Sequence, residues 1–155
     1  MADQTTARGS STDAAVPFNV LLVEDDEGDV IMIREAIESR STNTELHVVN
    51  DGIEAVAFLR RTDGYGDAPR PRLILLDLNM PRMDGREVLA EIKADPELIT
   101  IPVVVLTTSA ADEDVLSSYS LHANAYVTKR ADLDEFLAAV GKVDEFFAAT
   151  VRLPA

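Results

Sequence analysis

Short apolar runs without polar alternation recur along this chain, and segments with helical apolar spacing lie between them. Residues 20–23, 73–76 and 103–106 consist only of Val, Ile and Leu. Such runs are typical of strands that are covered on both faces, as in a parallel sheet. Parallel strands need long crossover connections, which are usually helices. The pattern therefore predicts an α/β fold, a doubly wound parallel sheet of five strands with helices on both faces.

Five strands and five helices are expected to alternate. The strands are expected near residues 20–23, 46–49, 73–76, 102–106 and 125–128. The helices are expected near residues 30–39, 53–59, 86–94, 112–121 and 133–147, and Asp51 with Gly52 is expected to cap the second. The last helix carries a stripe predicted to face the core, which consists of Leu133, Phe136, Leu137, Val140, Val143 and Phe147.

Length and charge limit the organisation and the partners of the chain. Its 155 residues suit one domain, predicted over 18–150 between tails at 1–17 and 151–155. A net charge of −14 argues against broad contact with nucleic acid or anionic lipid. There is no cysteine, no apolar run approaches the ~20 residues of a membrane span, and the first residues lack the features of a secretory signal. We therefore expect a cytoplasmic protein. Because the chain ends soon after the last predicted helix, we expect no attached DNA-binding or enzymatic output domain.

Polar residues follow the predicted strands, at the point where each strand ends. The carboxyl ends of parallel strands lie at one edge of the sheet, where ligands of such folds gather. We therefore expect these residues to meet in one cleft. They are Glu24 and Asp25 after the first strand, Asp77 after the third, Thr107 and Thr108 after the fourth, and Thr128 and Lys129 after the fifth.

The expected cleft has the donor set of a phosphoryl-transfer site. Three converging carboxylates would repel one another unless a cation joined them. Oxygen ligands without cysteine or paired histidine suit Mg²⁺ or Mn²⁺ rather than Zn²⁺. The Lys129 ammonium and the Thr107 hydroxyl could bind phosphoryl oxygens beside that ion. Asp77 is then the predicted nucleophile.

These residues together resemble the receiver domain of two-component response regulators, from Phe18 to about Phe147. The resemblance rests on the acidic pair Glu24-Asp25, on residues 77–85 (DLNMPRMDG), on Thr107 and on Lys129, in that order. It implies a flavodoxin-like fold with strand order 2-1-3-4-5. It also implies a phosphoacceptor switch rather than an enzyme, which takes a phosphoryl group from a histidine kinase onto Asp77.

The resemblance also assigns roles within the cleft. Asp25 would be the main Mg²⁺ ligand, Glu24 would act mostly through water, Asp77 would bind the metal and accept the phosphoryl group, and Asn79 would offer its backbone carbonyl. Lys129 would hold the phosphate. On phosphorylation Thr107 would swing toward the phosphate and Tyr126 would turn inward behind it. That switch would change the surface of the fourth helix, fifth strand and fifth helix, which is the expected dimer or partner surface.

Two departures from the commonest receiver pattern narrow the resemblance. Arg130 follows Lys129 where many receivers have a proline that helps to place the ammonium. The connection over residues 60–72 is long, and the last helix ends in Phe146-Phe147. Together these features resemble the single-domain receivers that partner bacterial phytochrome-type kinases, which are often dimers.

Several residues and functions leave alternatives open. Asp26, Glu27 and Asp29 are interpreted as favouring the N-terminus of the first helix, rather than as site residues. Tyr126 could equally be an ordinary half-buried strand aromatic, and His47 and His122 are expected to be structural or exposed. The alternative function is a Mg²⁺-dependent phosphatase that passes through an aspartyl phosphate, but such enzymes carry a second aspartate where this chain has Asn79. A receiver that is never phosphorylated is disfavoured because the predicted site is complete.

Overall fold

The computed structural model describes residues 16–39, 42–80, 82–107, 123–129 and 132–150. Five parallel strands form one sheet in the order β2-β1-β3-β4-β5, as the resemblance implied. The strands are β1 (Phe18–Val23), β2 (Thr44–Val49), β3 (Leu73–Asp77), β4 (Val103–Thr107) and β5 (Ala125–Thr128). The helices are α2 (Glu27–Glu38), α3 (Gly52–Arg60), α4 (Gly85–Ala94), α6 (Leu133–Glu145) and the π-helix η1 (Phe146–Thr150).

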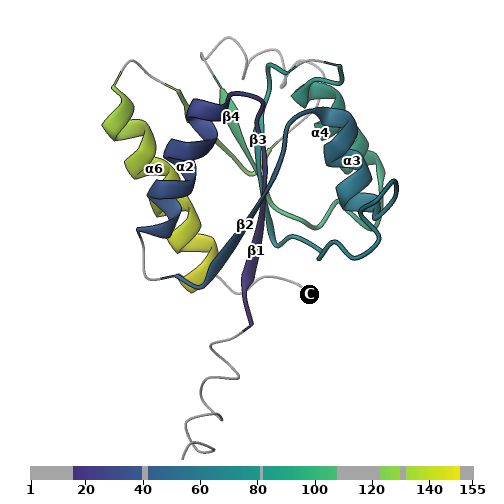
Figure 1. The fold of residues 1–155 in the computed structure, drawn as a ribbon, viewed down its shortest axis with the longest axis horizontal. Coiled ribbons are helices and arrows are strands. Elements are labelled where there is room, and N and C mark those ends of the chain that lie inside the picture. The colour runs from purple at the N-terminus through teal and green to yellow at the C-terminus, as the bar shows by residue number, and fades with distance from the viewer. Residues whose placement is uncertain (1–15, 40–41, 81, 108–122, 130–131, 151–155) are drawn as a thin grey trace, which may run out of the picture.

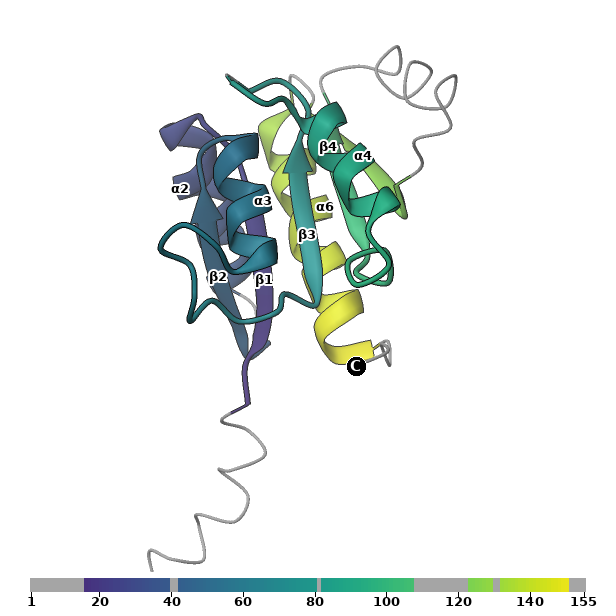
Figure 2. The same ribbon diagram turned by 90° about the vertical axis from the view of Figure 1, so that its right-hand side faces the viewer.

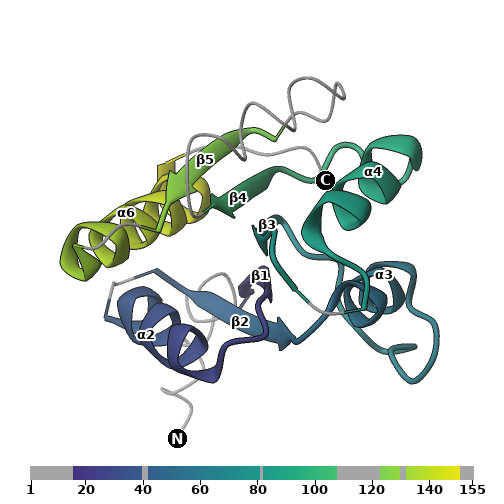
Figure 3. The same ribbon diagram turned by 90° about the horizontal axis from the view of Figure 1, so that it is seen from above.

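The helices cover both faces of the sheet, α2 and α6 on one face and α3 and α4 on the other (Figures 1 and 3). Side chains of successive strand residues point to opposite faces, so each strand contributes to two apolar cores. Leu21 and Ile74 pack in the core beneath α3 and α4, whereas Leu22 and Leu75 pack in the core beneath α2 and α6. This double burial is the reason that the strand sequences lack polar alternation.

An aspartate caps each of the four described α-helices. Asp26, Asp51, Asp84 and Asp132 each accept hydrogen bonds from backbone N–H groups of the following first turn. Asp84 also forms a capping box with Glu87. The cap at Asp26 explains why α2 begins at Glu27, before the apolar spacing predicted from residue 30. Part of the acidic excess of the chain therefore sets where helices start.

The stripe predicted for the last helix is partly wrong. Phe136 and Val140 are buried against the sheet, and Leu137, Val143 and Phe147 are partly buried. Leu133, the first residue of α6, is 42% exposed, so the stripe is not covered along its whole length. The helix predicted at 112–121 lies outside the described residues.

The connections at the two ends of the sheet differ. The long connection from α3 to β3 runs along the amino ends of the strands, at the bottom of Figure 2. The links from β1 to α2 and from β3 to α4 lie at the carboxyl ends, onto which Figure 3 looks. Because the strand order reverses beside β1, this carboxyl end is where a ligand crevice is expected.

Candidate functional site

The carboxyl ends of β1, β3, β4 and β5 bring together the residues predicted from strand ends. Glu24 directly follows β1, Asp77 and Thr107 are the last residues of β3 and β4, and Lys129 directly follows β5. Thr108, the other hydroxyl residue that follows β4, lies outside the described residues. The strand ends therefore place two acids, one hydroxyl and one ammonium at a single edge of the sheet.

Three carboxylates form the acidic part of this site. Glu24, Asp25 and Asp77 each offer one oxygen, and these oxygens all lie within 4.8 Å of one another. Glu24 and Asp77 are only 1% and 4% exposed, whereas Asp25 is exposed to solvent. Three clustered carboxylate oxygens are hard ligands, which fit Mg²⁺, Mn²⁺ or Ca²⁺ better than a soft metal. The site can therefore hold a divalent cation that is open to solvent on the Asp25 side.

Lys129 supplies the positive charge of the site. Its Nζ lies 2.8 Å from Glu24 Oε1, 3.0 Å from Asp29 Oδ2 and 3.6 Å from Asp77 Oδ1. Its backbone N–H donates to the carbonyl of Thr107 at 2.6 Å, which ties the start of the following loop to the end of β4. Arg130 lies outside the described residues. The absence of proline after Lys129 does not keep the ammonium from the acidic cluster.

Asp29 is a site residue that the sequence interpretation missed. It lies in the first turn of α2, as expected, but its carboxylate also pairs with Lys129. The interpretation of Asp29 as a helix-end residue alone is therefore wrong. Its position four residues after Asp25 indicates the same edge of the sheet, but not which way its side chain faces.

Burial and neighbouring charges change the protonation of the site. Burial raises the pKa of Glu24 from 4.5 to about 7, and the negative charge of Asp77 adds to this, while the hydrogen bond from Lys129 opposes it. Burial also raises the pKa of Asp77, against the attraction of Lys129. For Lys129, burial alone would lower the pKa, but the hydrogen bond to Glu24 and the charge of Asp77 raise it above its ordinary value. The ammonium therefore stays charged while protons compete for the acids.

The loop after Asp77 returns close to the strand that carries this residue. The Asn79 N–H donates to Asp77 Oδ1 across 3.4 Å, and the Gly85 N–H donates to the carbonyl of Leu78 at 2.9 Å. A Cβ at Gly85 would lie 2.3 Å from the backbone oxygen of Asp77, so only glycine fits there. Asn79 is exposed beside the acidic cluster, and the metal-binding role of its carbonyl stays a prediction.

Thr107 and Tyr126 lie on the two strands at the far side of the site. Thr107 is fully buried at the end of β4. Tyr126 is half-buried on β5, packs against the core beneath α3 and α4, and its hydroxyl lies 3.5 Å from the backbone N–H of Ala123. Both interpretations of Tyr126, switch residue and strand aromatic, are compatible with this position.

His47 is structural, as predicted. Its Nε2 lies 2.9 Å from Asn19 Oδ1, and its ring centre lies 5.6 Å from that of Phe58. His122 lies outside the described residues. His47 therefore takes part in contacts outside the acidic cluster.

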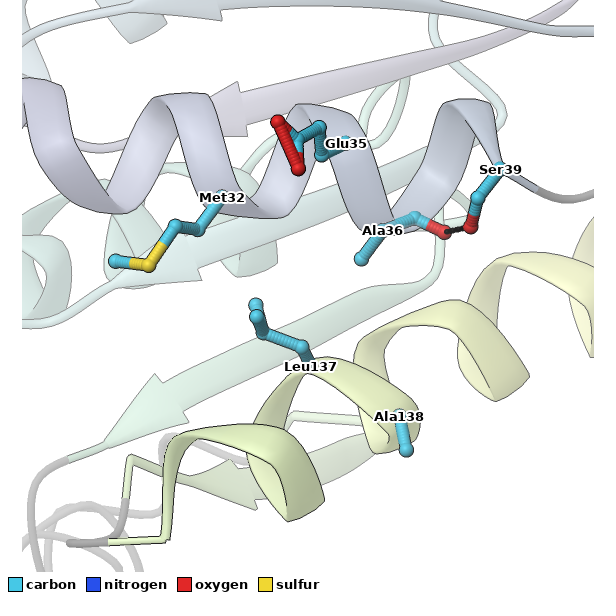
Figure 4. A pocket seen from close by; sticks show the side chains of 6 residues that line it. All are labelled: Met32, Glu35, Ala36, Ser39, Leu137 and Ala138. Atoms are coloured by element: carbon cyan, nitrogen blue, oxygen red, sulfur yellow. Dashed lines mark hydrogen bonds between the residues drawn. The ribbon is translucent and has the colours of Figure 1, made fainter.

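A shallow groove of about 310 Å³ lies between α2 and α6, and none of the site acids lines it. Figure 4 shows Met32 and Leu137 facing each other across it, with Glu35 and Ser39 on the α2 side.

In the part of the chain that the structure describes, no helix has the length and apolarity needed to cross a membrane.

Comparisons with known proteins agree with this geometry. The sequence profile of the response regulator receiver domain matches residues 20–141. Response regulator Rcp1 of Synechocystis sp. is 47% identical over 145 residues, which are 94% of this chain and 99% of that protein. The structure of the phosphorylated cyanobacterial phytochrome response regulator RcpA matches with 48% identity and a TM-score of 0.83, over 90% of this chain and all of that one. The Mn²⁺-bound form of Rcp1 matches with 48% identity and a TM-score of 0.82, over the same shares of the two chains.

Proposed function

This chain belongs to the response regulator receiver family, and from that premise we propose that Asp77 is its phosphoacceptor. The protein is a two-component response regulator receiver, a phosphoacceptor switch rather than a classical enzyme, so the alternative of a Mg²⁺-dependent phosphatase is set aside. The observation that carries the assignment of Asp77 is its position. It is the buried acid at the end of β3 whose oxygen lies within reach of both the Lys129 ammonium and the other two carboxylates.

The proposed reaction transfers a phosphoryl group from a phosphohistidine. One Asp77 oxygen bonds to phosphorus while the bond from phosphorus to the donor imidazole nitrogen breaks, and that nitrogen keeps the electron pair. The Lys129 ammonium, 3.6 Å from Asp77 Oδ1, pairs with the charge that arrives on the phosphoryl oxygens. Burial of Asp77 strengthens this attraction because little water screens it.

Mg²⁺ is the proposed metal, held by Asp25, Asp77, the backbone carbonyl of Asn79 and, through water, Glu24. The oxygen-only donor set supports this assignment, and so does the Mn²⁺ in the similar structure of Rcp1. When bound, the ion supplies positive charge for the phosphoryl oxygens. The chain supplies the carboxylates that hold it, two of them buried, at the switch point of the sheet.

Thr107 and Tyr126 are the proposed switch residues. A phosphoryl group on Asp77 places new acceptor oxygens beside the end of β4, toward which the Thr107 hydroxyl can turn. Tyr126 then moves into the space behind it, next to the apolar core that it already touches. This change would reach the surface of β5 and α6 by repacking local contacts.

A sensor histidine kinase, of the phytochrome type, is the proposed phosphodonor. The similarity to Rcp1 and to the phytochrome response regulator RcpA supports this assignment. The site edge also suits a protein donor, because the acidic cluster reaches the surface at the exposed Asp25. Partner exchange, rather than a small-molecule substrate, is then the route by which the phosphoryl group arrives.

We further propose that residues 18–150 form the receiver domain between tails at 1–17 and 151–155, and that the domain pairs with a second copy. The proposed dimer surface comprises the fourth helix predicted at 112–121, β5 and α6. Phe146, which is 51% exposed and stacks edge-on against Phe147, supports an apolar contact at the end of α6.

Light scattering with and without beryllofluoride tests whether the protein forms this dimer. Phe146→Ser should lower the mass toward that of a monomer, and the exposed Ile53→Ser on α3 should not.

Phosphorylation of the full chain by acetyl phosphate with Mg²⁺ tests the central proposal. Intact-mass spectrometry should show the addition of one phosphoryl group to the natural protein and none to Asp77→Asn. Asp84→Asn is the matched control, because it changes an aspartate in the same loop, and asparagine still caps α4. Labelling of Asp77→Asn at the natural rate would overturn the assignment.

A further inference from the structure

The corner between β2 and α3 contacts both segments that carry the site acids, although none of its residues belongs to the acidic cluster. The corner consists of Asn50, Asp51 and Gly52. On one side it touches the end of β1, and on the other it touches the loop of residues 78–84 that follows Asp77. It is therefore placed to set how these two segments lie relative to each other.

A bidentate ion pair joins the corner to the loop. The Arg82 guanidinium donates from Nε to Asp51 Oδ2 at 2.9 Å, and its Nη2 donates to the same oxygen. The other oxygen of Asp51, Oδ1, accepts from the Glu54 N–H at 2.9 Å as the cap of α3. Each Asp51 oxygen thus has its own task, and the loop is attached directly to the rigid first turn of a helix.

The backbone of the loop also forms a hydrogen bond with the corner and packs closely against it. The Gly52 N–H donates to the Met83 carbonyl at 2.9 Å, and a Cβ at Gly52 would lie 2.1 Å from that oxygen. Arg82 itself has φ of +63°, in the left-handed region that non-glycine residues seldom occupy. An arginine in that strained conformation needs a compensating contact, which the pair with Asp51 provides.

The opposite contact of the corner reaches the end of β1. The Asn50 side-chain amide donates to the backbone carbonyl of Glu24 at 3.3 Å, and the Glu24 N–H donates to the carbonyl of Val49 at 3.0 Å. The residue that follows β1 and the loop that follows β3 are thus attached to the same three residues.

We propose that Arg82 and Asp51 are positioning residues that hold the 78–84 loop against the acidic site and thereby set its affinity for Mg²⁺. The proposal rests on the function proposed above, because it assumes that the loop contributes the Asn79 carbonyl to the metal. Residues that orient metal ligands commonly change affinity by tenfold or more when replaced. The alternative is that this ion pair, between an arginine side chain that is 55% exposed and an aspartate side chain that is 10% exposed, is only structural. Its loss would then lower the stability slightly and leave the affinity for metal unchanged.

Three variants of the full chain separate these readings. Arg82→Gly removes the ion pair and at the same time relieves the left-handed backbone, so the loop loses this ion pair without gaining strain and keeps the bond from Gly52 to Met83. Asp51→Asn keeps an acceptor to cap α3 but loses the charge. The double variant Asp51→Asn/Arg82→Gly measures whether the two residues act as a unit. Arg60→Gln is the matched control, because it breaks exposed ion pairs away from the site, with Glu91 at 2.8 Å and Asp95 at 3.5 Å.

Isothermal titration with Mg²⁺ and hydrogen exchange of the metal-free protein are the readouts. Each single variant should weaken Mg²⁺ binding about tenfold, the double variant should be no weaker than the singles, and amides of residues 78–85 should exchange faster. Arg82→Lys, which keeps the charge without the bidentate geometry, should recover part of the affinity. Arg60→Gln should match the natural protein in both readouts.

An unchanged Mg²⁺ affinity in Arg82→Gly and Asp51→Asn would overturn the positioning role, and so would a double variant whose losses add. Acetyl phosphate labelling of the same samples keeps the two proposals apart. In one outcome the variants lose Mg²⁺ affinity, while the natural protein binds Mg²⁺ but is never labelled. That outcome supports the positioning role and contradicts the assignment of Asp77 as phosphoacceptor. In the other outcome the natural protein is labelled normally and the variants bind Mg²⁺ as tightly as it does. That outcome supports the phosphoacceptor assignment and contradicts the positioning role.

Discussion

The bodies of β1 and β3 and the residues at their carboxyl ends are buried to nearly the same degree but differ in chemistry. Residues 20–23 and 73–76 are apolar and almost fully buried. The very next residues, Glu24 and Asp77, are almost as inaccessible yet carry carboxylates. Burial stabilises the strand bodies by the hydrophobic effect and disfavours the charges at their ends. At both β1 and β3, the stabilising apolar residues are therefore followed directly by a residue that the function requires.

The largest expected effect comes from damaging a strand body. Ile74→Ala should lower the free energy of unfolding by about 3 to 4 kcal/mol, because it leaves a cavity in the core beneath α3 and α4. Urea denaturation measures the change. Ile53→Ala is the control, because that side chain is 49% exposed, and it should cost about 0.5 kcal/mol or less. Similar costs at both positions would contradict the division between strand bodies and surface.

A substitution beside the junction of the β3 strand body and its carboxyl end should lower both the stability and the affinity for Mg²⁺. Gly85→Ala places a Cβ 2.3 Å from the Asp77 carbonyl and 2.6 Å from Leu78 Cα, which are backbone atoms that cannot move aside without shifting β3. We expect a loss of about 2 to 3 kcal/mol of stability, together with weaker Mg²⁺ binding. Gly66→Ala meets nothing within 4 Å and should leave both unchanged. Calorimetry and metal titration of the two variants check this.

Removing the cation from the strand ends should destabilise the metal-free protein. Lys129→Met leaves the buried Glu24 and Asp77 without their positive partner, at a cost of about 2 kcal/mol. Saturating Mg²⁺ should recover most of this loss, because the ion binds the same carboxylates in the folded state only. Thermal unfolding with and without Mg²⁺ measures both quantities. Lys142→Met, at an exposed position on α6, should show neither effect.

The last expected effect needs no substitution and comes from pH. The pKa of Glu24 is about 7 in the folded protein and 4.5 ordinarily, so the folded state holds this proton more tightly than the unfolded chain. The metal-free protein should therefore lose stability as the pH rises from 4.5 to about 7, and stay level above that. Mg²⁺ must displace the same proton, so its affinity should rise about tenfold between about pH 6 and about pH 8. Titration at both values tests this, and Glu24→Gln should remove the share of the dependence that Glu24 contributes, while the share of Asp77, whose pKa is also raised, stays.

Much of the site could be predicted because it depends on strand order alone. Once the apolar runs indicate parallel strands, the residues after them must share one edge, and Glu24, Asp77, Thr107 and Lys129 do. The contacts of Asp29 could not be predicted in the same way. Its pairing with Lys129 depends on which way the first turn of α2 faces, which follows from the packing of that helix.

The wrong expectation for Leu133 has a related cause. Helical spacing identifies the face of α6 that turns toward the core, and Phe136 and Val140 lie on it as predicted. Spacing does not tell where along its length a helix begins to cover the sheet. Leu133 lies on the same stripe, one turn before Phe136, and is nevertheless exposed.

The sequence by itself determined the class of fold, the edge where the site lies and the acids and ammonium that form it, because strand burial and strand ends are local properties of the chain. Only the tertiary structure decided how these groups are held. Three contacts join residues of different elements: the ion pair of Arg82 with Asp51, the hydrogen bond from Gly52 to Met83, and the ion pair of Lys129 with Asp29. Such contacts depend on side-chain direction and on the distance between packed helices, which no local pattern records.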